Sequence, residues 1–253
     1  MPSPESHRPS SQDRHLPPPG GTVIGIGSLP HSDFARAFHF IEEQKLNIPF
    51  LPQLPKAPGH GNMLDELANR ENGVFASEEL PRFLKQQRQQ LELVSKEGHL
   101  KGHIENHPLR EFFLKWQLVG PLTYRKFSGQ SLAECGDLLL NEIETRLSIL
   151  LRTLEDTSCK QILFLDEPVL DSEECRDGVH SEEYRAFVTN LRSVFARANI
   201  DLVLGLHCCG RFDASSSEIL FRLGFQIISF DLHLFTSADE LSLFLLSLNR
   251  DLV

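Results

Sequence analysis

The chain lacks long apolar runs and clusters of basic residues. None of the apolar runs among its 253 residues approaches the ~18 to 20 residues that a membrane-spanning helix needs. The net charge is −10 and no lysine- or arginine-rich run is present, whereas a nucleic-acid surface depends on clustered positive charge. We therefore expect neither a membrane nor a nucleic acid as a partner.

Cysteine is also scarce, and its spacing does not fit a disulfide framework. The five cysteines, at positions 135, 159, 175, 208 and 209, are odd in number, and the adjacent pair would bond only with strain. Residues 1–21 are rich in proline, serine and histidine where a secretion signal would be apolar, and they hold too few apolar side chains to fold. The sequence thus predicts reduced thiols, a cytoplasmic location, a disordered leader over 1–21 and a single folded domain over 22–253.

Short apolar runs alternate with longer amphipathic stretches. The runs predict strands over 22–26, 48–51, 113–119, 161–165, 202–206 and 226–230. The stretches between them predict helices over 33–44, 79–96, 131–155, 181–198, 215–223 and 238–248. Continuous apolar strands suit a parallel sheet covered on both faces, and the lone tryptophan, Trp116, is expected in that core. The alternation indicates an α/β protein, either a (β/α)8 barrel or a doubly wound sheet.

Polar and glycine-containing groups repeatedly follow the predicted strands. They occupy positions 27–31, 52–55, 120–123, 166–168, 207–210 and 231–233. A barrel gathers the carboxyl ends of all its strands around one mouth, where active sites lie. The pattern therefore favours a TIM-type barrel. A fragment of a phosphate-binding loop at 25–27 lacks the third glycine of a dinucleotide-binding motif and is weak evidence for that function.

One strand end offers candidate metal ligands. Alternation along the strand puts His207 and Cys209 on one face and Cys208 on the other. An imidazole and a thiol are two of the four ligands of a tetrahedral zinc site, and Asp231, which follows the next strand, offers an oxygen. The alternative is that the cysteines are small buried hydrophobes and that His207 is a hydrogen-bonded core residue.

The motifs at the strand ends together resemble the cobalamin-independent methionine synthase family. Its superfamily also includes uroporphyrinogen decarboxylase and the corrinoid methyltransferases. The matching motifs are IGSLPH (26–31), VGPLT (119–123), LDEPVL (165–170), HCCG (207–210) and ISFD (228–231). They occur in the family's order, and together they are more specific than any one of them.

The resemblance implies a (β/α) barrel that holds zinc through a His-x-Cys pair and a carboxylate on the next strand. In this chain the metal ligands would be His207, Cys209 and Asp231, with Asp231 where the family carries glutamate. The resemblance also implies that zinc holds a small substrate thiol, such as homocysteine, as the thiolate that attacks a methyl donor. Asp231 would be a ligand of the zinc that activates the thiol, so it is expected to be a catalytic residue, together with Asp166.

The resemblance assigns substrate-binding roles to four residues. Asp166 falls where the family's aspartate grips the amino group of an amino-acid thiol, and Gly27 and Ser28 fall where backbone and hydroxyl hold its carboxylate. Gln53 stands near an acidic substrate-binding position of the family. Two alternatives are that Asp166 caps the following loop and that Ser28 caps the next helix.

The chain departs from the family at its carboxyl end. The last strand and the C-terminal cysteine ligand of the family have no counterpart in the sequence. We therefore expect a barrel without its last strand, whose open edge favours pairing with another copy. The sequence predicts a zinc-dependent, methionine synthase-like methyltransferase. The alternatives are a degenerate barrel with a binding or regulatory role, and a metal-free decarboxylase of the same superfamily.

Overall fold

The computed structural model describes most of the chain between residues 24 and 231. The described residues are 24–25, 27–44, 46, 48–56, 63–68, 73–97, 112–154, 159–210, 214–231, 233, 237, 239 and 242. The predicted leader over 1–21 lies outside them, as does nearly all of the predicted helix over 238–248. In this part of the chain, no helix combines the length and the apolar character that crossing a membrane requires.

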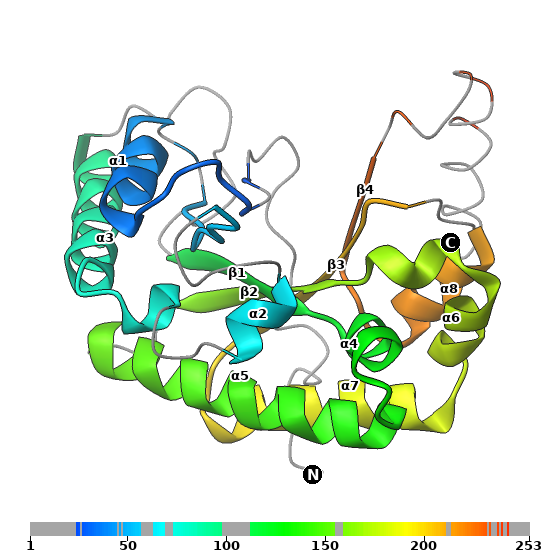
Figure 1. The fold of residues 1–253 in the computed structure, drawn as a ribbon. Coiled ribbons are helices and arrows are strands. Elements are labelled where there is room, and N and C mark those ends of the chain that lie inside the picture. Colours follow the sequence, from blue (N-terminus) through cyan, green and yellow to red (C-terminus); the bar gives the residue numbers. More distant parts are fainter. Residues whose placement is uncertain are drawn as a thin grey trace, which may run out of the picture.

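Four parallel strands form a sheet in which each strand lies beside the one before it in the chain (Figure 1). They are β1 (Phe113–Val119), β2 (Lys160–Asp166), β3 (Leu202–Cys208) and β4 (Ile227–Phe230). Two earlier segments continue the same parallel order through single bridges, which join Phe50 to Lys115, Ile48 to Ile24 and Gln53 to Ser28. The predicted α/β class is confirmed.

Helices connect the strands, and most of them begin where the sequence predicts. They are α1 (Phe34–Gln44), α2 (Met63–Ala68), α3 (Leu80–Glu97), α4 (Pro121–Ser128), α5 (Leu132–Leu154), α6 (Glu173–Val179), α7 (Glu182–Arg197) and α8 (Ala214–Arg222), with short 3-10 helices η3 (Val74–Ala76) and η4 (Pro168–Asp171). The Ser181 hydroxyl caps α7 by accepting a hydrogen bond from the Tyr184 amide. Asp33, not Ser28, caps α1, because its carboxylate accepts the Arg36 amide at 2.8 Å.

The sequence did not predict α4 or α6. Pro121 occupies the first position of α4, where a missing N–H costs nothing. Gly129 ends α4 in the left-handed conformation, with φ of 72°. Both residues are typical of turns, and here they mark the two ends of a helix.

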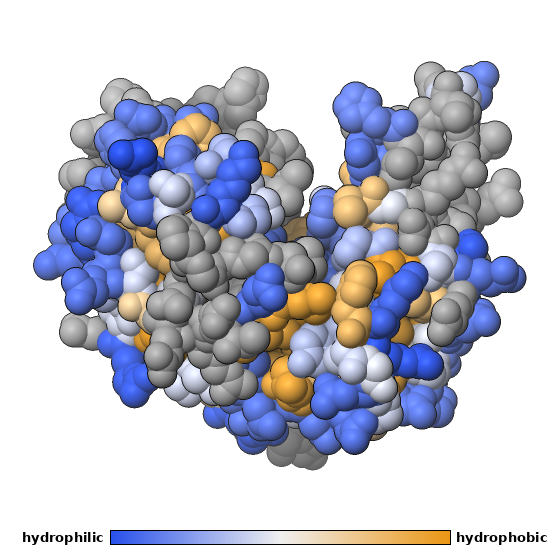
Figure 2. Space-filling model, in the orientation of Figure 1, coloured by the Kyte–Doolittle hydropathy of each residue, from blue (hydrophilic) through white to orange (hydrophobic). Residues whose placement is uncertain are grey.

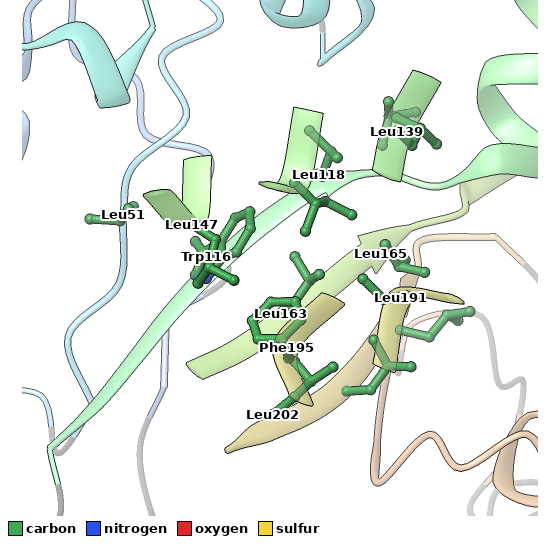
Figure 3. Close-up of a cluster of buried hydrophobic side chains, with 14 of the residues drawn as sticks. Leu51, Trp116, Leu118, Leu139, Leu147, Leu163, Leu165, Leu191, Phe195 and Leu202 are labelled. Atoms are coloured by element: carbon green, nitrogen blue, oxygen red, sulfur yellow. The ribbon is translucent and has the colours of Figure 1, made fainter. Parts of the chain in front are cut away.

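One face of the sheet packs against α5 and α7. Every second side chain of a strand points to this face, which is rich in leucine and excludes water (Figure 3). Trp116 and Leu163 are 0% exposed, so the expectation that the tryptophan belongs to the core is confirmed. The cluster in Figure 3 includes Leu51, Trp116, Leu118, Leu139, Leu147, Leu163, Leu165, Leu191, Phe195 and Leu202.

The opposite face, which we call the inner face, carries a second apolar cluster. Each consecutive parallel segment contributes one or two side chains to this cluster, which consists of Ile24, Ile48, Phe113, Ile162, Phe164, Val203 and Ile227. At Gly205 a Cβ atom would lie 2.6 Å from the Phe164 ring, so glycine leaves the space that this ring fills. The apolar layer covers the amino-terminal part of the inner face, and polar residues take over toward the carboxyl ends.

Candidate functional site

Polar side chains gather on the inner face near the carboxyl ends of the strands. Asp166 ends β2 and pairs in register with His207 on β3, which pairs in turn with Ser229 on β4. Lys115 and Gln117 occupy the same face of β1. Figure 2 shows the molecule hollowed between the part that contains α1 and α3 and the part that contains β4, with β1 and β2 beneath the hollow in Figure 1.

Lys115 is almost fully buried, with 2% of its surface exposed. Its Nζ donates a hydrogen bond to Gln117 Oε1 at 2.5 Å and lies 4.9 Å from the centre of the Phe164 ring. Gln117 Nε2 donates in turn to Gln53 Oε1. Burial lowers the pKa of Lys115 to about 7, and the negative charge of Asp166 acts in the opposite direction. The lysine therefore exchanges between ammonium and free amine near neutral pH.

Asp166 is the acidic partner of this lysine. It is 2% exposed, and its carboxylate is near enough to Lys115 to favour the ammonium form. Its backbone carbonyl accepts the Gly120 amide at 2.9 Å, which ties the end of β2 to the end of β1. Asp166 thus lies on the same face of the sheet as Lys115, on which its charge acts, and beside His207 on β3.

The surroundings of His207 favour the neutral imidazole. Its Nδ1 lies 3.1 Å from Ser229 Oγ, on the neighbouring strand. Burial lowers the pKa of His207, as does the positive charge of Lys115, whereas Ser229 and Asp231 act in the opposite direction. A neutral imidazole is the form that accepts a proton or ligates a metal.

The structure brings three of the four predicted substrate-binding residues close to Lys115 or Gln117: Gly27, Gln53 and Asp166. At Gly27, where φ is +125°, a Cβ would lie 2.5 Å from Gln117 Oε1, so glycine allows this close approach. The Gln53 amide donates to the Gly27 carbonyl at 2.8 Å, and the Gln53 side chain meets Gln117. Ser28 pairs with Gln53 through the backbone but is exposed.

The predicted zinc ligands only partly come together. Cys208 is 0% exposed and faces the helix-covered core, as predicted, while Cys209 is exposed beyond the end of β3. Asp231 acts electrostatically on His207, but its Oδ1 accepts the His233 amide at 2.9 Å. Among the described residues no three histidine, cysteine or acidic side chains are grouped closely enough to hold a metal ion. The donor chemistry of His207, Cys209 and Asp231 suits zinc, and a complete site would require Cys209 to turn toward His207.

A second buried acid, Glu167, fixes the geometry next to Asp166. Its carboxylate is 0% exposed and accepts the Leu122 amide at 3.1 Å and the Thr123 amide and hydroxyl at 2.7 Å each. These groups form the first turn of α4, where a negative charge is favourable. At Gly120 a Cβ would lie 2.2 Å from the Glu167 carboxyl group, so only glycine allows this contact.

The sequence patterns did not indicate roles for Lys115, Gln117 or Glu167. The segment 113–119 was interpreted as one apolar run, although Lys115 and Gln117 alternate with Trp116 and Leu118 and therefore share a face. That alternation was the available signal. Glu167 was recognised only as part of a motif, because its partners lie 44 and 45 positions earlier in the chain.

Comparison with known proteins found no similarity: no protein-family model, no curated protein and no solved structure matches this chain.

Burial raises the pKa of Glu167 to about 7, which predicts a specific pH dependence of stability. Between its ordinary pKa and 7 the folded state binds a proton that the unfolded state releases, so folding becomes less favourable as pH rises through this window. We expect the free energy of unfolding of the wild type to fall between about pH 5 and pH 8 by about 1 to 3 kcal/mol more than that of Glu167→Gln. Urea unfolding at both pH values measures the two changes.

The exposed acid Glu183 on α7 provides a control for this comparison. Glu183→Gln should keep the wild-type dependence, because its charge is solvated in both states. If wild type and Glu167→Gln changed in parallel with pH, Glu167 would not titrate as a buried acid.

Proposed function

We propose that this chain is a methionine synthase-like methyltransferase domain acting on a small amino-acid thiol such as homocysteine. We also propose that its parallel strands belong to a (β/α) barrel. The order of the strands supports the barrel, because each one lies beside its predecessor as in a singly wound structure. The apolar layer on the inner face supports it as well, since barrels fill their interior with such layers.

One observation carries the functional proposal: Lys115 and Asp166 are both almost fully buried on the inner face, and the Asp166 charge acts on Lys115, whose amine reaches Gln117 toward the carboxyl end of β1. Burying opposite charges contributes little to stability, because desolvation offsets their attraction. Titratable groups with shifted pKa values at this end of the sheet are typical of binding and catalytic sites.

The charges of this pair match those of an amino acid. A substrate carboxylate is complementary to the Lys115 ammonium, and a substrate ammonium is complementary to Asp166. Gln53 and Gln117 add amide groups on the same side. Both charges of such a substrate would be paired with charges of the protein. This pairing would fix the direction in which the substrate side chain points.

The reaction requires that the substrate thiol be deprotonated. The thiolate sulfur then attacks the methyl carbon of a folate, corrinoid or other donor, and the carbon's bond to the donor breaks with its electron pair remaining on the donor. Zinc, when bound, would hold the thiol as thiolate. His207 supports this step, because its Nδ1 lies within hydrogen-bond distance of Ser229 and burial favours the neutral imidazole.

The exposure of Cys209 favours a second candidate, a domain that binds the amino-acid thiol without transferring a methyl group. Both candidates share the Lys115 and Asp166 binding step. They differ in zinc content, since the methyltransferase requires Cys209 to turn toward His207.

Substrate binding is tested by calorimetry with homocysteine. We expect Asp166→Asn and Lys115→Met each to weaken binding at least about tenfold, because each variant removes one charge-assisted contact. Lys85→Met, on the exposed face of α3, serves as the control for removing a lysine and should bind like wild type. Equal affinity in wild type and Asp166→Asn would contradict the proposed binding mode.

Zinc binding is tested by atomic emission on protein purified with zinc and then dialysed. We expect bound zinc in wild type, and a large loss in His207→Asn and Cys209→Ser, because each removes a ligand. Cys208→Ser is the matched control, since this neighbouring thiol faces the helices and should leave zinc content unchanged. Absence of zinc from wild type, or its retention in Cys209→Ser, would favour the binding domain over the methyltransferase.

A further inference from the structure

The amine of Lys115 has the surroundings of a nucleophile. It lies over the Phe164 ring and beside the apolar layer of the inner face, where an ammonium ion is poorly solvated. A lysine is nucleophilic only as the free amine, and removal from water favours that form. The other lysine on the same sheet, Lys160, lies 3.9 Å from Asp201 in an ion pair at the opposite end of β2.

An acid and two amides complete these surroundings. The Asp166 carboxylate acts electrostatically on the amine, and Gln117 and Gln53 form a hydrogen-bonded chain that begins at Lys115 Nζ. A carboxylate can take a proton from an attacking amine, and amide N–H groups can bind a carbonyl or carboxylate oxygen. His207 and Asp231, at the ends of β3 and β4, also titrate on this side, and Lys115 and Asp231 both act electrostatically on His207.

We propose that Lys115 forms a covalent imine with a small 2-oxo acid, of which glyoxylate is the smallest. The activity goes beyond methyl transfer, because it needs neither a thiol nor a methyl donor. A small carbonyl compound is required, since Lys115 is enclosed. The polar row that continues through Asp166 ends in His207 and Ser229, which are only partly buried, so a small molecule would approach from the side of β4.

The step balances without any redox partner. Lys115 Nζ attacks the carbonyl carbon, and the π electron pair moves to the oxygen, which takes up a proton. Asp166 accepts a proton from the nitrogen and returns it to the hydroxyl group, which leaves as water. The nitrogen lone pair then forms the C=N bond, and the nitrogen releases its remaining proton to solvent in place of the one that the oxygen took up, so that amine and 2-oxo acid give imine and water.

The imine can be trapped by reduction. Purified protein is incubated briefly with glyoxylate and sodium cyanoborohydride at about pH 7, where exposed lysines are almost wholly protonated. Peptide mass spectrometry then locates carboxymethylated lysine. We expect labelling of Lys115 at least about tenfold faster than that of Lys85, and about tenfold slower labelling in Asp166→Asn. Protein unfolded in urea should show no preference for Lys115.

Variants exclude reaction at a neighbouring amine. Lys115→Met should lose the fast phase of labelling, whereas Lys85→Met should retain it. Fast labelling that persists in Lys115→Met would overturn the proposal, as would equal labelling of Lys115 and Lys85 in folded wild type. The wild-type peptide map decides the question even if a variant fails to fold. Because the labelling reaction contains no thiol, its outcome does not depend on the result of the homocysteine calorimetry.

Discussion

The interaction between Lys115 and Asp166 imposes the main constraint on this structure. A lysine at 2% exposure loses its water shell, and its environment must either stabilise the ammonium or accept the free amine. Asp166 favours the ammonium while burial favours the amine, and the two effects leave the pKa at about 7. The glutamine contacts then orient an amine whose charge is easily changed, which is a useful property in a binding or catalytic centre.

The backbone around this pair is arranged to keep it in place. Glycine at 27 and 120 lets Gln117 and Glu167 approach the main chain at distances that a Cβ would prevent. Glu167 is the residue after Asp166, and its carboxyl group accepts hydrogen bonds from amides in the first turn of α4. A shift of this helix would therefore also move the end of β2. Two buried acids in sequence thus have different tasks: one faces the lysine, and the other holds the helix that follows β1.

Much of the fold could be predicted from the sequence, because local signals determine it. The apolar run at 113–119 became β1 with the same bounds, and the serine cap at 181 began α7 as expected. The inward polar residues were harder to find. Lys115 and Gln117 look like interruptions of an apolar run until pairing with β2 shows which face they share. The position of Cys209 depends on the bend after β3, which strand alternation does not predict beyond the strand end.

The most direct test is an NMR titration of the lysine side chains in protein labelled at lysine, with the Lys115 signal assigned from Lys115→Arg. The account predicts that Lys115 titrates near pH 7, whereas exposed lysines titrate near ~10.4. It also predicts that Asp166→Asn lowers the Lys115 midpoint further, because the ammonium loses its partner. A Lys115 midpoint equal to those of the exposed lysines, unchanged by Asp166→Asn, would contradict the buried centre on which the proposed function rests.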